Sequence, residues 1–181
     1  HESLVIRGNY LTRLPSEVGN LTDLHLLDLA KNSLERVPKE LGRLVNLRVL
    51  CLERNRLVSL PDEIRNLCNL TNLELQKNSL RSVPAGIGQL HALEHVDLRR
   101  NAISSLPREV GNLKALKTLQ LNANELESLP NELQHLRSLR LLSLGGNYLT
   151  APPIGIGALG QLKWLDILHN PWMGELKRIV S

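Results

Sequence analysis

Aromatic residues are almost missing from this sequence, which has no phenylalanine, two tryptophans and two tyrosines. A hydrophobic core built from such a chain must be aliphatic, and leucine alone supplies 43 of the 181 residues. The shortage of aromatics also argues against binding of single-stranded nucleic acid, in which bases commonly stack on aromatic side chains.

Several targeting and anchoring features are missing as well. No apolar stretch approaches the about 18 residues of a membrane span, and the N-terminus lacks the charged and then apolar layout of a signal peptide. Lys and Arg outnumber Asp and Glu by 22 to 18, but they form no basic tail of the kind that binds nucleic acid or a lipid surface.

Cysteine is scarce, since the only two, Cys51 and Cys68, form no paired framework of the kind found in extracellular domains. We therefore expect a cytoplasmic, monomeric protein that does not enter a membrane. Two Asn-x-Thr sequons, at Asn20 and Asn69, leave a secreted glycoprotein open as the alternative.

What the sequence does contain is one unit repeated every 23 residues without a slip. Each unit has leucines in alternation, then an asparagine, then Leu-Pro, and then an aliphatic residue that is usually followed by glycine. The asparagines are Asn9, Asn32, Asn55, Asn78, Asn101, Asn124, Asn147 and Asn170. The prolines are Pro15, Pro38, Pro61, Pro84, Pro107, Pro130 and Pro153.

The pattern within a unit predicts a short strand and a return segment. Leu50 and Leu52 alternate with period two, so one strand places both on the same face. The asparagine is expected to end the strand and to bond buried backbone groups of its own and adjacent turns. The structural ladder expected from this comprises Asn32, Asn55, Asn78, Asn101, Asn124 and Asn147. Proline at a first-turn position, as in "PDEIRNL", favours short helical or 3₁₀ turns on the opposite side.

From about Leu4 to about Trp172 the unit resembles the leucine-rich repeat. Units ending as "SLPREVGNL" does (Ser105–Leu113) resemble the 23-residue intracellular Ras-group class, which includes Ras-pathway scaffolds, Ras suppressors and plant relatives. The resemblance implies an α/β fold, a curved right-handed leucine-rich-repeat solenoid with a parallel sheet on its concave face and short helical or 3₁₀ turns on its convex face. No unit can bury its leucines alone, so stacked neighbours must close one core.

The ends depart from the pattern. Pro152 replaces a core aliphatic residue, which predicts locally loosened packing, and Leu176, Ile179 and Val180 have the spacing of a capping helix. We expect a single domain over residues 1–181, with about eight repeats of which the first and last are incomplete or atypical. Because solenoid ends need caps and none precedes the first unit, we expect a fragment of a longer protein.

The free columns beside the strand leucines are predicted to face the concave side. In the second to fifth units, acids (Asp28, Glu74 and Asp97) run beside a basic column (Lys31, Arg54, Lys77 and Arg100), whereas the last three units are neutral there. The candidate partner-binding residues are Asp28, Glu74, His95, Asp97, Arg99, Arg100, Gln120, Asn122, Leu141, Trp164 and Leu168.

Two interpretations of this face stay open. The charged columns either neutralise each other as a solvated face or orient a bound protein, and Trp164 either lies under a missing cap or anchors that partner. No catalytic or metal site is indicated. Of His91 and His95, one is expected at a turn and the other on the strand face, so they do not converge on a metal ion. The glycine-rich stretch "GIGALG" (Gly155–Gly160) falls on a return segment, so we expect no cofactor.

The sequence therefore predicts a non-catalytic scaffold or adaptor of intracellular signalling, and the family resemblance implies a small GTPase or a phosphatase as partner. The alternative is the targeting domain of a larger enzyme of the ubiquitin ligase, cyclase, kinase or deadenylase type. Binding of nucleic acid is a third hypothesis, which the acids beside the basic column disfavour.

Overall fold

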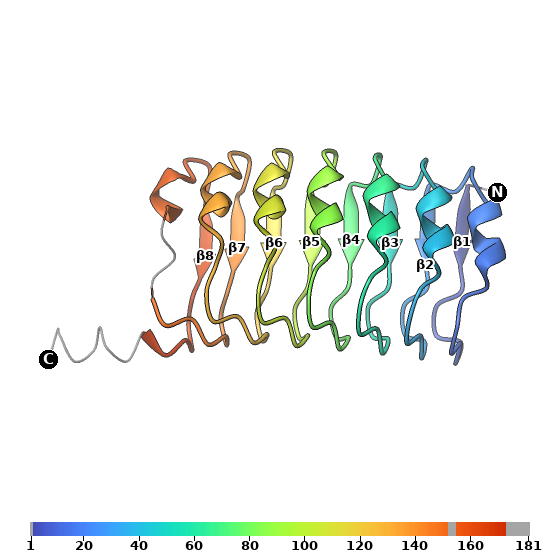
Figure 1. Cartoon of the computed structure of the whole chain (residues 1–181), viewed down its shortest axis with the longest axis horizontal. Helices are drawn as coiled ribbons and strands as arrows, with labels where there is room; N and C mark the ends of the chain where they lie inside the picture. Colours follow the sequence, from blue (N-terminus) through green and yellow to red (C-terminus); the bar gives the residue numbers. More distant parts are fainter. Residues whose placement is uncertain (1, 152–154, 173–181) are drawn as a thin grey trace, which may run out of the picture.

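The computed structural model describes residues 2–151 and 155–172, which form an open, curved parallel sheet with one short 3₁₀ helix after each of its first seven strands (Figure 1). The eight strands lie side by side in sequence order. They are β1 (Ser3–Val5), β2 (Leu26–Asp28), β3 (Val49–Cys51), β4 (Asn72–Glu74), β5 (His95–Asp97), β6 (Thr118–Gln120), β7 (Leu141–Ser143) and β8 (Trp164–Asp166).

Strand register follows the repeat, because each residue pairs with the one 23 positions later, as Leu50 does with Leu73. The leucines at the centre of β2, β3 and β4 are fully buried, and a second buried column that includes Leu52 and Leu75 lies beside them on the same face. The predicted solenoid is confirmed, with an aliphatic core between the sheet and the 3₁₀ helices.

The strands are shorter than the repeat pattern predicts. Each has three residues, and β3 ends at Cys51, four positions before Asn55. The expectation that the asparagine ends the strand is therefore wrong. The turn of the backbone comes first, at residues such as Arg54, whose φ is 55°.

The convex side consists of 3₁₀ helices, of which the first six begin after the repeat proline and η7 begins after Gly155. They are η1 (Ser16–Asn20), η2 (Lys39–Arg43), η3 (Asp62–Asn66), η4 (Ala85–Gln89), η5 (Arg108–Asn112), η6 (Asn131–His135) and η7 (Ile156–Ala158). The proline is the N-cap and not a first-turn residue, since Pro61 has an extended backbone with φ −70° and ψ 149°. Its fixed φ allows that geometry at little entropic cost.

Glycine sets how closely successive 3₁₀ helices pack. A Cβ atom on Gly42 would lie 2.5 Å from the carbonyl oxygen of Glu63 in the next unit, and Gly19, Gly88 and Gly111 meet the next unit in the same way. In the third unit the residue equivalent to Gly42 is Arg65. The residue that faces it in the next unit is Gly86, and a Cβ atom on Gly86 would lie 3.0 Å from the Cβ atom of Arg65. One member of each such pair is thus small enough for the close approach.

Two expectations fall outside the described residues, namely the loosened packing at Pro152 and the capping helix at Leu176, Ile179 and Val180. No helix within residues 2–151 and 155–172 has the length and apolar character that a bilayer crossing requires.

Candidate functional site

The loops that come after the strands are held by the repeat asparagines. Asn55 donates from Nδ2 to the carbonyl oxygens of Leu52 and Leu29, each at 3.0 Å, and its Oδ1 accepts the N–H of Leu34 at 3.0 Å. One side chain therefore satisfies three backbone groups, two of which belong to the preceding unit. Asn32, Asn78, Asn101, Asn124, Asn147 and Asn170 make the corresponding bonds.

The residue before each asparagine has a left-handed backbone. In the second to fifth units this residue is basic, and we name Lys31, Arg54, Lys77 and Arg100 the basic row. Their φ values lie between 54° and 59°, and all four side chains are exposed. The equivalent residues elsewhere include Gly8 and Gly146, for which a positive φ carries no steric cost.

The acids that neighbour the basic row on the concave side are engaged by other cations. Arg7 lies 2.8 Å from Glu53 and 3.3 Å from Asp28, so one guanidinium bridges the second and third units. Arg99 forms a two-pronged pair with Asp97, with an Nη2–Oδ2 distance of 2.6 Å and an Nε–Oδ1 distance of 2.9 Å. Such paired geometry fixes both groups more firmly than a single contact does.

The charged columns therefore do not neutralise each other in the way that the solvated-face interpretation requires. Among the residues that the structure describes, no salt bridge involves the basic row. The like charge of Arg54 chiefly lowers the pKa of Lys77, with contributions from desolvation, Arg100 and Arg99. The basic row is an exposed line of like charge.

Of the three acids in the predicted acidic column, Glu74 forms no salt bridge in the described part of the chain. Burial raises the pKa of its carboxyl group, and the nearby charge of Asp97 raises it further.

Aspartates at the strand ends also have a local backbone role. Oδ1 of Asp28 accepts the N–H of Ala30, and Oδ1 of Asp97 accepts the N–H of Arg99, both at 3.0 Å. Asp166 bonds the N–H of Leu168 at 3.1 Å in the same way. Asp97 is only 4% exposed and is beneath Arg99, so it supports the face more than it presents itself to a partner.

The sheet from β5 to β8 carries a hollow of about 540 Å³ on the same face. We name it the strand-exit hollow. It is lined by Arg99, Arg100, Gln120, Asn122, Ala123, Ser143, Gly145, Gly146, Asp166, Leu168 and His169. Nδ2 of Asn122 donates to Oδ2 of Asp166 at 2.6 Å across the intervening unit, where Gly145 has no side chain in the way.

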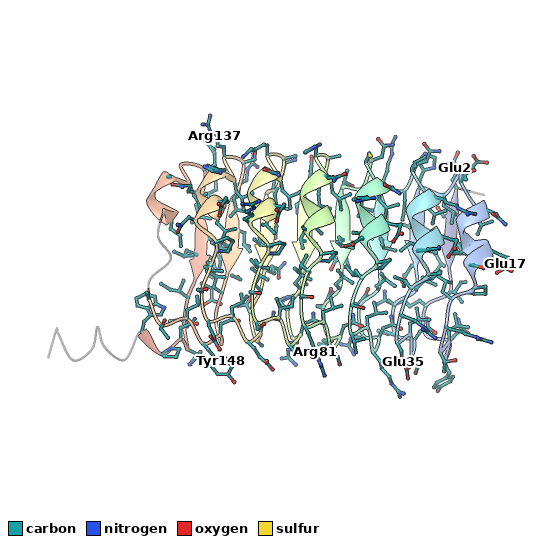
Figure 2. All side chains as sticks on the ribbon, viewed as in Figure 1. Glu2, Glu17, Glu35, Arg81, Arg137 and Tyr148 are labelled. Carbon is teal, nitrogen blue, oxygen red and sulfur yellow. The ribbon has the colours of Figure 1, made fainter. Side chains whose placement is uncertain are left out.

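Of the remaining predicted residues, Leu168 lines this hollow, whereas His95, Leu141 and Trp164 are the first residues of β5, β7 and β8. His95 in β5 and Leu141 in β7 are half-buried on the sheet. Trp164 and Leu168 are 62% and 57% exposed, and in the described part of the chain β8 has a neighbour on one side only, which also leaves the core residue Leu165 37% exposed. Tyr148 projects from the loops beyond the strand ends, as do Arg81 and Glu35 (Figure 2).

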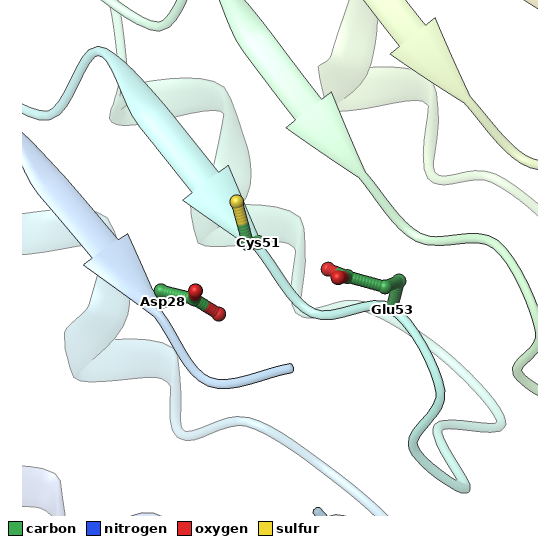
Figure 3. A group of neighbouring side chains, drawn as sticks. All are labelled: Asp28, Cys51 and Glu53. Atoms are coloured by element: carbon green, nitrogen blue, oxygen red, sulfur yellow. The ribbon is translucent and has the colours of Figure 1, made fainter. Parts of the chain in front are cut away.

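A second group of side chains gathers at the ends of β2 and β3, which sequence reasoning missed. Possible metal-ligand atoms of Asp28, Cys51 and Glu53 all lie within 4.8 Å of one another (Figure 3). The Arg7 guanidinium already supplies a cation to both carboxylates. Burial, together with the charge of Asp28, raises the pKa of the Cys51 thiol to about 12, so the sulfur keeps its proton at neutral pH. The group is explained as an ion-pair cluster.

Two family models match the chain. One describes a leucine-rich repeat region and matches residues 85–178, and the other describes a leucine-rich repeat and matches residues 2–57. No curated protein matches the chain at a significant level.

Solved structures with the same fold include a leucine-rich-repeat protein of Leptospira interrogans, which is 37% identical with a TM-score of 0.68 over 90% of this chain and 47% of that one. A TDR receptor is 33% identical with a TM-score of 0.86 and coverages of 93% and 30%. The ectodomain of the plant membrane receptor kinase GASSHO1/SCHENGEN3 of Arabidopsis thaliana, in complex with CASPARIAN STRIP INTEGRITY FACTOR 2, is 32% identical with a TM-score of 0.75 and coverages of 93% and 24%. The chain thus spans less than half the length of each of these structures.

Proposed function

The chain belongs to the leucine-rich-repeat family, a generic protein–protein interaction fold, and we propose that it is a non-catalytic recognition module that binds a protein partner on its concave face. Its finer role, on the resemblance of its 23-residue units to the Ras-group class, is that of a cytoplasmic scaffold or adaptor in signalling. A small GTPase or a phosphatase is the partner type that this resemblance favours.

The observation that carries the proposal is the make-up of the concave face. Leu168 and Arg100 line opposite ends of the strand-exit hollow, and Arg99 lines it beside Arg100. Trp164, at the start of β8, adds a second exposed apolar side chain to the last unit. Tryptophan and arginine contribute disproportionately to the binding energy of protein interfaces. Eight adjacent strands also give enough width for the about 800 Å² that each partner buries in a standard interface.

A solved relative supports a polypeptide ligand. The GASSHO1/SCHENGEN3 ectodomain, 32% identical to this chain, was solved in complex with CASPARIAN STRIP INTEGRITY FACTOR 2. The same relative favours the alternative function, a targeting domain attached to a larger enzyme, because it is the ectodomain of a receptor kinase. An open reading frame that extends only a few residues beyond both ends of this chain would exclude this alternative.

The experiment is a comparative affinity capture from cell lysate, with proteins identified by mass spectrometry. Wild type is compared with Trp164→Ala/Leu168→Ala, which truncates two exposed side chains and leaves the hydrogen-bond ladder intact. The matched control is Val45→Ala/Val58→Ala, which truncates two exposed side chains outside the strands, 46% and 50% exposed. Asp97 is left unchanged because it is buried and bonds the backbone.

We expect a captured protein that is recovered with wild type and with the control but lost with the concave-face variant. All three proteins should melt at closely similar temperatures, since exposed truncations change stability little. Equal recovery by all three would move the binding surface away from the concave face at β8 and would contradict the proposal.

A further inference from the structure

The basic row is an exposed line of charge that the rest of the described structure leaves without acidic partners. Its four members occupy one column in four successive units, and three acids of the same face, Asp28, Glu53 and Asp97, bond Arg7 or Arg99 instead. Unneutralised like charges in a line repel one another, as the lowered pKa of Lys77 reflects. A ligand that brings negative charge to this line relieves the repulsion.

Spacing indicates the shape of such a ligand. Neighbouring strands are about 4.8 Å apart, so the three intervals from Lys31 to Arg100 span roughly 14 Å. An extended polypeptide rises about 3.3 Å per residue, and five residues therefore reach about 13 Å between the first and the last. A short acidic run, lying across the strands, matches the length of the row.

The surface beyond the row indicates a second feature of the ligand, next to its acidic run. Arg100 ends the basic row and also lines the strand-exit hollow, so the two features are continuous. The floor of the hollow is low because Ala123, Gly145 and Gly146 have little or no side chain. At its far margin, about three strand intervals or roughly 14 Å from Arg100, lies exposed Leu168. An apolar side chain of the ligand would fit there.

We propose that the basic row binds an extended acidic polypeptide segment of the partner, whose acidic run is separated by about four residues from an apolar residue that contacts Leu168. This inference rests on the proposed protein-recognition function and names the chemistry of its partner. Binding of such a segment differs from recognition of a folded, uncharged surface, because the basic row provides both the affinity for the segment and the dependence of that affinity on salt.

A nucleic acid is the competing source of negative charge. The phosphate backbone needs a broad basic surface and, for single strands, aromatic platforms. The carboxylate of Glu74 lies on the same face, and Trp164 is separated from the row by the hollow. These features favour a short acidic run over a continuous phosphate backbone.

The test measures fluorescence anisotropy of labelled peptides that carry about five consecutive glutamates and one leucine about four residues away, placed C-terminal in one peptide and N-terminal in the other. A third peptide replaces the glutamates with glutamines, and a labelled single-stranded RNA oligonucleotide is the fourth probe. The variant is Lys31→Asn/Arg54→Asn/Lys77→Asn/Arg100→Asn. Asparagine removes the charge and tolerates the left-handed backbone of these positions.

The matched control is Lys39→Gln/Arg43→Gln/Arg65→Gln/Arg137→Gln, which removes four exposed charges from the 3₁₀ helices and the loop after η6. Each variant reduces 22 basic residues to 18, equal to the 18 acids, so both have the same net charge. Any difference between them therefore reports the position of the charges.

We expect at least one glutamate peptide to bind wild type and the control alike, to bind the row variant at least about tenfold more weakly, and to lose affinity as salt is raised. Equal binding to both variants, or equal binding of the glutamine peptide, would overturn the inference. So would tighter binding of RNA with the same dependence on the row. If the peptides fail while capture from lysate still depends on Trp164 and Leu168, the proposed function stands and the basic row is not its recognition element.

Discussion

Asn122 and Asp166 bond each other across a whole repeat, with 2.6 Å between Nδ2 and Oδ2, because the residue between them in the sheet is Gly145. The other end of the solenoid has a similar arrangement. Arg7 reaches Glu53 at 2.8 Å past the small, buried Ala30 of the intervening unit. Small residues in the concave columns thus allow polar side chains two units apart to meet, and these contacts shape the face on which we place the partner.

Replacing Gly145 with alanine should break the first of these contacts. The new Cβ would lie 2.8 Å from Oδ2 of Asp166, so the carboxylate must move away from Asn122. We expect a loss of about 1–2 kcal/mol in the free energy of unfolding, measured by urea denaturation. The control is Gly157→Ala, whose Cβ would meet nothing within 4 Å. Equal stability of the two variants would show that the Asn122–Asp166 bond contributes little.

The ladder predicts a larger effect at Asn124, which is 5% exposed. Its side chain bonds the carbonyl oxygens of Leu98 and Leu121 and the N–H of Ile103. Asn124→Ala leaves these buried groups without partners, so we expect a loss of about 2 kcal/mol or more in urea melts. Asn112→Ala, at an exposed position in η5, should change stability by less than about 0.5 kcal/mol. A ladder variant as stable as that control would contradict the role of the asparagines.

Packing between the 3₁₀ helices predicts a ranking of glycine variants. A Cβ on Gly88 would lie 2.5 Å from the carbonyl oxygen of Glu109, whereas one on Gly86 would lie 3.0 Å from the Cβ of Arg65 and the carbonyl oxygen of Asp62. We expect Gly88→Ala to lower the unfolding free energy by about 1–3 kcal/mol and Gly86→Ala to lower it less. Thermal melts of the two variants test this order, and the reverse order would contradict it.

The two cysteines should differ in reactivity. Burial raises the pKa of Cys51 from 9.0 to about 12, so its thiolate is scarce at pH 8, whereas Cys68 is exposed. Iodoacetamide at pH 8 followed by mass spectrometry should label Cys68 and leave Cys51 largely unmodified in the folded protein. Equally rapid labelling of both would contradict the buried environment of Cys51.

The same raised pKa has a consequence for stability. The folded chain keeps the Cys51 proton to higher pH than the unfolded chain does. This contribution to stability is therefore fully present below about pH 9 and is lost as pH rises toward 12. Urea melts of Cys51→Ala between these pH values should show a weaker decline with pH than melts of wild type. An unchanged decline would assign the pH dependence to other groups.

Sequence reasoning predicted the parts of this molecule that repeat. The spacing of Leu50, Leu52 and Asn55 was enough to predict the strand register and the face of the sheet that packs on the core, because every unit buries equivalent residues in the same way. The 3₁₀ helices were predictable from proline and the brevity of the return segment. The end of the strand was predicted too late in the unit, since β3 ends at Cys51 and not at Asn55.

The candidate site was less predictable, because its contacts do not repeat. Arg7 contacts Glu53 two units away. This ion pair depends on the small residue Ala30 in the unit between them, and no column of like residues indicates it. The pairing of Asp97 with Arg99, two residues away, removed an acid that the columns alone would assign to the basic row. The backbone role of Asp28 could have been recognised, since aspartate often bonds the N–H two residues on at a turn.

Site-specific photo-crosslinking in cell lysate can show which face of the solenoid contacts the partner. Benzoylphenylalanine replaces Gln120, on the concave face in the strand-exit hollow, in one protein and Arg43, at the end of η2 on the convex side, in the other. We expect a crosslinked protein from position 120 that is missing at position 43 and that unlabelled wild type competes away. The same crosslink from position 43 alone would place the partner on the 3₁₀ helices and contradict recognition through the concave face.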